Sequence, residues 1–333
     1  MKTTLSIFVF IILFITTHSC HTEKSASINS NAIKPEKYQQ LLGTGIDVNW
    51  AQFNKIIDKY NAQIPADFKK KGFDHVRIRV KNQANKFILT HLNQIVDDCL
   101  KNNLIPIIAY TADDFKENPD ENNRDNVIQW WKNVAAYFKD KSPLLSFDII
   151  VEVTDKLNKK PGKLNDLYEK VVNEIRKTNP NRIIFISPVV RSAPEKLSLL
   201  KIPTKANGFL MAEWHFYASG PSKTNPKKLW TTGTDTERQL IINKINTAVN
   251  WQQKTGIYSW VGAWMPGNYN KADDYTIKEQ IPFAQFVTCQ LKKAHIPFAV
   301  NADIKFYDFN TNQWRYRQKV LQTILQPECK SSL

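Results

Sequence analysis

The densest group of reactive side chains lies in residues 209–221, which read Phe-Leu-Met-Ala-Glu-Trp-His-Phe-Tyr-Ala-Ser-Gly-Pro. The apolar start and the Gly-Pro end predict a strand that leads into a loop. Because side chains alternate across a strand, Glu213, His215 and Tyr217 share one face. A carboxylate, an imidazole and a phenol can exchange protons, so the strand predicts an acid–base site. Hydrogen-bonded polar core residues are the alternative.

Two other apolar runs carry charged residues. Residues 145–153 form an apolar run that includes Glu152 near its end, which makes this carboxylate conspicuous. In residues 73–80, Arg77 and Arg79 fall on one face of a predicted strand. Two arginines inside a strand are costly to bury unless anions meet them. The run therefore predicts anionic partners for these arginines.

The elements that must position these side chains alternate regularly. From residue 41 onward, short apolar runs alternate with amphipathic segments, which is typical of βα units in a parallel sheet. The predicted strands lie in 42–50, 73–80, 104–110, 145–153, 182–188, 209–221, 256–264 and 297–300. The predicted helices are 64–71, 89–102, 126–139, 164–178, 237–255 and 281–293. Eight such units predict an α/β fold, a (β/α)8 TIM barrel, whose chemistry lies at the carboxyl ends of the strands.

Size and composition narrow the class of protein. A chain of 333 residues fits one α/β barrel better than two small domains. A hydrophobic content of 42% with 11% aromatic residues excludes a disordered protein. The 46 basic residues outnumber the 31 acidic ones, which favours acidic partners, although scattered surface lysines are the preferred explanation of the charge. No Arg-rich helix or aromatic RNA-binding signature is present, so nucleic acid is not an expected partner.

The first residues predict export. Lys2 precedes the apolar run 5–15, which is too short for a permanent membrane span and suits a signal peptide. The segment 17–20 resembles a relaxed bacterial lipoprotein box, which implies lipidation of Cys20. We therefore expect a cell-envelope protein held to the membrane only by a lipid anchor, with secretion or a periplasmic location as the alternative. The predicted divisions are a signal peptide (1–19), a flexible tether (20–38), the barrel (39–327) and a tail (328–333).

The remaining cysteines and the glycines predict no cofactor. Without Cys20, an odd number of cysteines remains, and their spacing indicates no pairing. Cys99 and Cys289 fall in helical patterns and are interpreted as buried thiols. No CxxC, HExxH or clustered histidine pattern indicates a metal, and the glycines near residue 43 form no GxGxxG dinucleotide site.

Taken together, these motifs resemble glycoside hydrolase family 5, the cellulase-like barrels, over residues 41–326. Residues 72–80 look like the second-strand motif of that family, which implies that Arg77 supports the catalytic carboxylates. Residues 147–153 are similar to the fourth-strand motif ending in Asn-Glu-Pro, which implies that Glu152 is the acid/base. His215 and Tyr217 match the sixth-strand His-x-Tyr that contacts substrate. Residues 304–308 with Trp314 resemble the segment after the eighth strand.

The sequence also departs from the family pattern. Val151 and Val153 replace the asparagine and proline that flank the acid/base. The match of residues 260–264 to the seventh-strand Gly-Glu-Phe puts Ala263 at the nucleophile position. Retaining hydrolysis needs two carboxyl groups about 5 Å apart, and alanine provides none.

Three functions stay open, and hydrolysis of a polysaccharide or oligosaccharide comes first. In that reading Glu152 is the acid, and Glu213, Asp113 or Asp114 supplies the second carboxylate. The surplus of positive charge allows an anionic substrate. The side chains expected to be catalytic are Glu152, Glu213, His215 and Tyr217. Those expected to bind substrate are Arg77, Arg79, Asn49, Tyr110, Asp113, Trp264 and Asn268.

The second function is a lyase acting on a uronic-acid glycan. In it, Tyr110, His215 or Tyr217 moves the proton while Arg77 or Arg79 and a loop asparagine neutralise the substrate carboxylate. The third is a barrel that binds glycans without cleaving them. Its stacking surfaces would come from Trp50, Trp214, Trp230, Trp264 and Tyr269, although the alternation predicts that Trp214 packs in the core.

Overall fold

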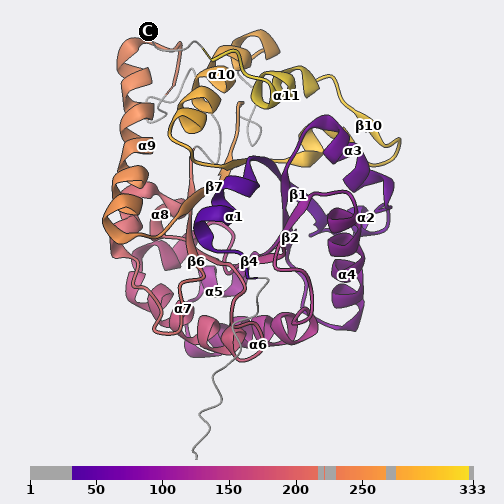
Figure 1. Cartoon of the computed structure of the whole chain (residues 1–333), viewed down its shortest axis with the longest axis vertical. Helices are drawn as coiled ribbons and strands as arrows, with labels where there is room; N and C mark the ends of the chain where they lie inside the picture. The colour runs from indigo at the N-terminus through magenta and orange to yellow at the C-terminus, as the bar shows by residue number, and fades with distance from the viewer. Residues whose placement is uncertain (1–31, 217–220, 222–229, 268–274, 330–333) are drawn as a thin grey trace, which may run out of the picture. The chain divides into compact units, whose positions relative to one another are not determined.

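The protein folds as a closed barrel of eight parallel strands, each paired with its neighbours in chain order (Figure 1). The computed structural model describes residues 32–216, 221, 230–267 and 275–329. The strands are β1 (Thr44–Ala51), β2 (His75–Val80), β3 (Ile105–Tyr110), β4 (Ser146–Asp148), β5 (Ile184–Ile186), β6 (Leu210–His215), β7 (Ser259–Trp264) and β8 (Phe298–Val300). The predicted (β/α)8 barrel is confirmed.

The helices that surround the barrel include all six that the sequence predicts. The longer ones are α3 (Gln63–Lys71), α4 (Lys86–Lys101), α6 (Glu121–Tyr137), α7 (Pro161–Arg176), α9 (Asp235–Thr255), α10 (Ile277–Lys293) and α11 (Gln318–Leu325). The short elements are α2 (Asn54–Ile57), α5 (Asp113–Glu117), η1 (Asp155–Lys159), α8 (Val189–Ser192), η2 (Pro194–Leu199), η3 (Asp303–Lys305), β9 (Tyr307–Asp308) and β10 (Gln313–Trp314). Capping boxes at Thr234 and Thr276 fix the starts of α9 and α10.

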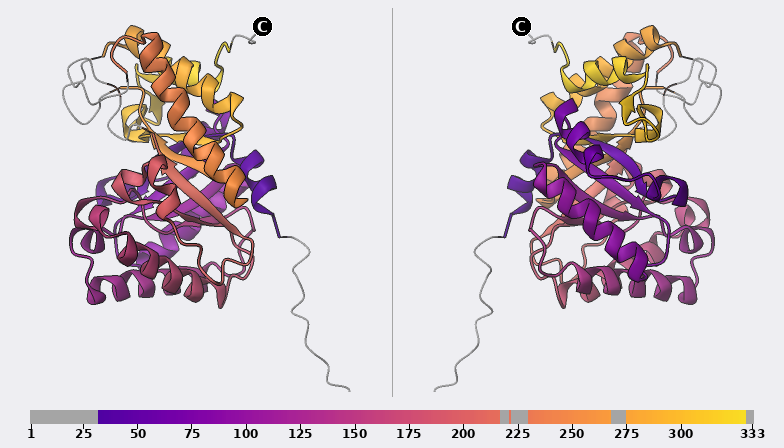
Figure 2. Two further views of the ribbon diagram at one scale, coloured as in Figure 1. Left: turned by 90° about the vertical axis from the view of Figure 1, so that its left-hand side faces the viewer. Right: turned by 90° about the vertical axis from the view of Figure 1, so that its right-hand side faces the viewer.

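One end of the barrel is closed by α1 (Pro35–Leu42). This helix lies over the middle of the strand ring in Figure 1 and to one side of it in Figure 2. Tyr38 is fully buried, and its hydroxyl donates to the Leu144 carbonyl at 2.7 Å. Together with Leu42 it packs against barrel residues that include Trp260 and Phe185. Because β1 starts just after this helix, α1 covers the amino-terminal end and leaves the carboxyl ends of the strands for chemistry.

The starting point of the barrel differs from the predicted boundary at residue 39. Since α1 begins at Pro35 and buries Tyr38, the packed unit already includes residues assigned to the tether. The signal peptide and Cys20 lie outside the described residues. Within the part of the chain that the structure describes, no helix is both long and apolar enough to cross a membrane.

The fourth strand is shorter than the sequence indicates. We expected it over 145–153, but β4 ends at Asp148 and the chain from 149 to 153 is irregular. Glu152 has φ of +48°, a left-handed conformation that non-glycine residues seldom adopt. The apolar run 149–151 is buried, and Trp131 of α6 donates to the Ile149 carbonyl at 3.1 Å. Burial alone therefore produced the strand-like pattern.

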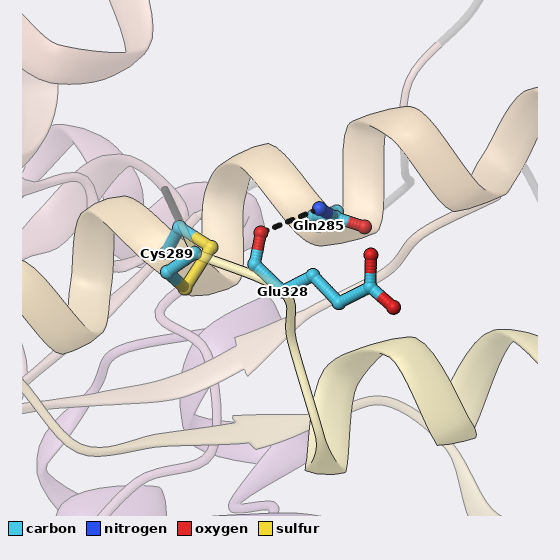
Figure 3. The surroundings of a disulfide bond; sticks show 4 residues. Gln285, Cys289 and Glu328 are labelled. Atoms are coloured by element: carbon cyan, nitrogen blue, oxygen red, sulfur yellow. Dashed lines mark hydrogen bonds between the residues drawn. A yellow bond between two sulfur atoms is a disulfide. The ribbon is translucent and has the colours of Figure 1, made fainter. Parts of the chain in front are cut away.

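A disulfide joins Cys289 of α10 to Cys329 (Figure 3). The interpretation of Cys289 as a free buried thiol is wrong, whereas Cys99 is free and buried. Beside the bond, Gln285 Nε2 donates to the Glu328 carbonyl at 2.8 Å. These contacts hold the start of the predicted tail against α10.

Candidate active site

A buried charge cluster crosses the inside of the barrel. Arg77 of β2 donates through Nε and Nη2 to the two carboxylate oxygens of Asp47, at 2.9 and 3.0 Å. Its Nη1 contacts Asp148 of β4 at 3.3 Å and Glu213 of β6. His215 Nε2 lies 2.6 Å from the same oxygen of Glu213. The anions that the sequence required for Arg77 are therefore Asp47, Asp148 and Glu213.

The pKa values of two carboxyl groups in this cluster shift in opposite directions. Burial and the neighbouring Glu213 charge raise the pKa of Asp148 well above its usual value. For Glu213 burial acts in the same direction, but contacts with His215 and Arg77 outweigh it and lower the pKa. Contact with Arg77 and His215 thus favours the charged form of Glu213, whereas burial and the Glu213 charge disfavour the charged form of Asp148. Such a cluster is stable only as a unit, because losing one partner leaves an uncompensated buried charge.

The sequence correctly predicts that Glu213 and His215 share the inner face of β6, while Tyr217 lies outside the described residues. Glu213 is fully buried, so no substrate atom reaches its carboxylate from solvent. Its carboxyl group occupies the space beside Gly262 of β7, where any Cβ would overlap it. In the strand pairing, the next position, Ala263, lies opposite His215. Glu213 therefore sits below Ala263.

Glu152 lies at the rim, where the chain turns after β4. About 23% of its side chain is exposed, and Arg191 Nη1 lies 3.2 Å from its Oε1. The backbone N–H of Arg191 also donates to the Val153 carbonyl at 2.8 Å, so the segment after β5 supports this turn. Among the described residues, no hydrogen bond joins Glu152 to Glu213 or His215. Glu152 is therefore partly exposed and paired with Arg191, whereas Glu213 lies in the core.

Asp113 lies close to the segment that carries Glu152. Lys116 Nζ is 2.9 Å from the Asp113 carboxylate and 3.3 Å from the Val151 carbonyl, so it links the ends of β3 and β4. Burial alone would raise the pKa of Asp113, but the charges of Lys116 and Lys81 outweigh it and lower the pKa. About 36% of the Asp113 side chain is exposed. It is therefore an ionised carboxylate within reach of solvent.

A second polar group occupies the rim between β8, β1 and β2. Arg79 Nη2 donates to Asn49 Oδ1 at 2.6 Å, and Asn49 Nδ2 donates to Asp303 at 2.8 Å. The Asn49 backbone N–H donates to the other oxygen of Asp303 at 3.0 Å. Burial raises the pKa of Asp303 to about 6. The structure thus brings together Arg79 and Asn49, both expected at the site, and adds Asp303.

The sequence reasoning missed three buried carboxylates, namely Asp47, Asp148 and Asp303. Two of them had a readable signal. Asp47 precedes Asn49 by two residues in β1, as Arg77 precedes Arg79 in β2, so both strands present polar pairs on the inner face. Asp148 is the other acid in the run that contains Glu152. Asp303 gave no signal, because it follows β8 in a segment without periodicity.

Several expected contact residues offer no surface for a sugar. Trp264 is fully buried between Phe283 and Phe298, so the expected substrate contact does not hold. Tyr110 stacks on Trp130 with ring centroids 4.2 Å apart, and burial raises its pKa to about 12. The tryptophans at 50, 214 and 230 are also buried. Asn268 and Tyr269 lie outside the described residues.

Comparison with known families decides the wider class. Residues 39–299 match the model of the cellulase family, glycosyl hydrolase family 5. The chain belongs to this family. Family 5 membership makes it a glycoside hydrolase-type protein.

Individual relatives of this family 5 chain are endoglucanases. Endoglucanase H of Acetivibrio thermocellus is 27% identical over 210 residues, which cover 59% of this chain and 22% of that protein. The chain thus spans about a fifth of the length of this relative. A hyperthermophilic endo-β-1,4-glucanase solved with substrate is 25% identical, with a TM-score of 0.75 and coverage of 88% and 99% of the two chains. Cel5A of Thermotoga maritima, solved with cellobiose, shares the fold at 20% identity, a TM-score of 0.75 and coverage of 87% and 99%.

Proposed function

We propose that this family 5 barrel binds a β-linked polysaccharide or oligosaccharide across the carboxyl-end rim and hydrolyses its glycosidic bonds with Glu152 as proton donor. The observation that carries the proposal is the position of Glu152, a partly exposed carboxyl group at the end of β4. A general acid must reach the leaving oxygen, so solvent access is its first requirement. The names of the relatives support a glucan as substrate.

The second carboxylate of the proposed reaction is Asp113. Glu213 is unsuitable, because it is fully buried and bound by Arg77 and His215. Asp113 is within reach of solvent, and Lys116 holds it beside the backbone of Val151, one residue before Glu152. A carboxylate pair separated by more than about 6 Å leaves room for water and leads to inversion.

The proposed step is hydrolysis of the glycosidic bond by water. Water attacks the anomeric carbon while the bond from that carbon to the leaving oxygen breaks. Glu152 gives its proton to the leaving oxygen, and Asp113 accepts a proton from the attacking water. The lowered pKa of Asp113 keeps it ionised at neutral pH but makes it a weak base. We therefore expect slow turnover for a glycoside hydrolase.

The elimination reaction has less support from the geometry. Arg77 is committed to three buried carboxylates, and Arg79 is bound to Asn49. Tyr110 is mostly buried with a raised pKa, so it is a poor proton acceptor. His215 is bound to Glu213. Arg77 and Tyr110 are therefore poorly suited to neutralise a substrate carboxylate or to abstract its neighbouring proton, and Tyr217 lies outside the described residues.

The second candidate function is glycan binding without cleavage. It is favoured by Ala263, a buried methyl group at the position that the family resemblance gives to the nucleophile. In that case the charge cluster under the rim stabilises the barrel and Glu152 contacts a sugar without transferring a proton.

A panel of polysaccharides separates these functions. The full chain is incubated with a β-1,4-glucan, a mannan, a xylan and a polyuronate, and both reducing ends and the ultraviolet absorbance of unsaturated products are measured. The E152Q and D113N variants are compared with D114N, which changes the exposed acid next to Asp113. We expect reducing ends to form without unsaturated products. Their rate of formation should fall by about 10²–10⁴-fold in E152Q and D113N and stay unchanged in D114N.

Other results of this experiment would contradict the proposed reaction or part of it. Unsaturated products together with reducing ends overturn hydrolysis in favour of elimination. No product from any glycan, with retardation in an affinity gel that contains one of them, replaces hydrolysis by binding. If D113N is fully active while E152Q is inactive, Asp113 has no role in the reaction and Glu152 remains the proton donor.

We also propose that the chain is exported and anchored through Cys20. The disulfide between Cys289 and Cys329 supports export, because such bonds persist in oxidising compartments. In bacterial cells, C20A should move the protein from the membrane fraction to the soluble fraction. Equal membrane association of C20A and wild type would contradict the anchor.

A further inference from the structure

A groove lined by side-chain amides lies between α2 and the start of α4, beside β1 and β2 (Figure 1). Its volume is about 470 Å³, within the range of about 300–1,000 Å³ for small-molecule sites. Its polar lining consists of Asn54, Asp58, Asn82, Gln83 and Asn85. Among the described residues that line it, none is cationic. This amide groove therefore suits neutral polar ligands better than anions.

The backbone that frames the amide groove is fixed by hydrogen bonds. Trp130 Nε1 donates to the Asn82 carbonyl at 3.0 Å. Asn85 caps α4, because its Oδ1 accepts from the Ile88 N–H at 3.0 Å. The buried side chains of Ile57 and Ile88 supply the apolar part of the lining. A groove held in this way loses little freedom when it binds a ligand.

Three of the amides are available for a ligand. Within the described part of the chain, the side chains of Asn54, Asn82 and Gln83 make no hydrogen bond to another residue. Each of these amides offers both a carbonyl acceptor and two N–H donors. A sugar hydroxyl also donates and accepts, so the amides match it without a charge on either side.

Exposed aromatic rings accompany the amides. Phe87, which lines the groove near the start of α4, is about 62% exposed. Phe53, directly before Asn54, is about 40% exposed. An exposed ring that stays out of the core is a surface for the apolar face of a sugar. The amide groove thus combines the two kinds of contact that a neutral sugar needs.

The amide groove lies close to the proposed site. Asn54 and Asn82 follow the ends of β1 and β2, so the groove is on the carboxyl-end side of the strands. Lys81, the residue before Asn82, has its Nζ 3.4 Å from the Asp113 carboxylate. A glycan that passes over Asp113 can therefore extend into the amide groove.

We propose that the amide groove is a subsite for a neutral sugar residue of a glycan chain. Asn54, Asn82 and Gln83 bind its hydroxyl groups, and Phe87 stacks on its ring. The inference rests on the proposed glycan-binding function and specifies a neutral sugar at this position of the chain. It also predicts that affinity increases with the length of the glycan, because a short one does not fill both the site and the groove.

Calorimetric binding measurements test this subsite without requiring turnover. Dissociation constants are measured in the E152Q background for disaccharides and hexasaccharides of β-1,4-linked glucose, mannose and xylose, and for a β-1,4-linked hexauronate. The first groove variant is F87A. Its control is Y137A, which removes another exposed ring, about 44% exposed, from α6.

The second groove variant, N54A/Q83A, removes two amides and leaves the helix cap at Asn85 intact. Its control is Q129A/N133A, which removes two exposed amides from α6. All of the substituted side chains are exposed, so the fold should be preserved in each variant.

We expect at least one neutral hexasaccharide to bind at least about tenfold more tightly than its disaccharide. Each groove variant should weaken binding of that hexasaccharide by at least about threefold, as the loss of a stacked ring or of two hydrogen bonds implies. The controls should bind it as before, and binding of the hexauronate should not change in any variant.

Unchanged binding of the hexasaccharide in both groove variants, or equal losses in the groove variants and their controls, would overturn the subsite. So would the absence of binding by every neutral hexasaccharide. An equal loss of hexauronate binding would overturn the selection of a neutral sugar. Absence of hydrolysis by wild type would overturn the proposed reaction but leave these dissociation constants readable.

Discussion

Glu213 of β6 and Arg77 of β2 form an ion pair that spans the interior of the barrel, between strands on opposite sides of the closed sheet. Both side chains are almost completely buried. The pair lies beneath the rim and is joined by Asp47, Asp148 and His215. This cluster organises the inside of the barrel, whereas Glu152 is partly exposed and paired with Arg191.

Removing Arg77 should destabilise the fold strongly. In R77M, three carboxylates lose their shared cation, and we expect the free energy of unfolding to fall by about 3–5 kcal/mol. Urea titration measures it. The control is K177M, which breaks an exposed pair with Glu174 and should change stability by less than about 1 kcal/mol. Similar stabilities for the two variants would show that the cluster is unimportant for folding.

Gly262 is expected to tolerate no side chain. A Cβ at this position overlaps the carboxyl group of Glu213, so G262A should lower the free energy of unfolding by about 1–3 kcal/mol. The matched control is G162A in α7, where a Cβ meets no atom within 4 Å. G162A should be neutral or slightly stabilising. Wild-type stability of G262A would mean that Glu213 moves easily, contrary to its fixed place in the cluster.

The disulfide should stabilise the barrel through the carboxyl-terminal segment. It closes a loop with a sequence separation of 40 residues, for which chain entropy gives about 3–4 kcal/mol. We expect C289S/C329S to have a lower thermal midpoint than oxidised wild type. Wild type treated with reducing agent should have the same midpoint as C289S/C329S. Cys99 stays in both proteins as a buried thiol. If reducing agent shifts the midpoint of C289S/C329S as well, the effect does not come from this bond.

Asp303 should make stability depend on pH. Its folded-state pKa of about 6 exceeds the ordinary value of 3.8, so the folded protein holds this proton more tightly than the unfolded chain. Its contribution is complete below about pH 4 and is lost as pH rises to about 6, with a total of about 3 kcal/mol. His75, whose pKa burial lowers to about 4, acts in the opposite direction over an overlapping range.

Comparison of wild type with D303N isolates this effect, because His75 is present in both proteins. Urea midpoints between about pH 4 and pH 7 should show that the stability advantage of wild type over D303N shrinks as pH rises. A constant difference across this range would contradict the raised pKa.

The sequence predicted the barrel because local patterns determine its parts. The strand and helix periods appeared in nearly every unit, and the predicted helices lie within a few residues of the observed ones. The exception is the segment 149–153, which was expected to continue the fourth strand but is irregular. Its apolar residues are buried, but Glu152 leaves the extended conformation.

The site was only partly predictable, since its contacts join strands that are distant in sequence. That Arg77 needs anions followed from the cost of burial, but the identity of the anions depends on how the barrel closes. Likewise, Lys116 brings Asp113 to the end of β4 through a side chain with no motif. The pairing of Cys289 with Cys329 depends on the chain returning to α10 after α11.

The most direct test of the proposed role of Glu152 compares two leaving groups. The value of kcat/KM is measured for wild type and E152Q on the oligosaccharide that wild type cleaves best, and on a dinitrophenyl glycoside of the same sugar. Since a dinitrophenolate leaves without protonation, E152Q should lose about 10²–10⁴-fold on the oligosaccharide but less than about tenfold on the activated glycoside. Equal losses on both substrates, or none on the oligosaccharide, would contradict Glu152 as the proton donor.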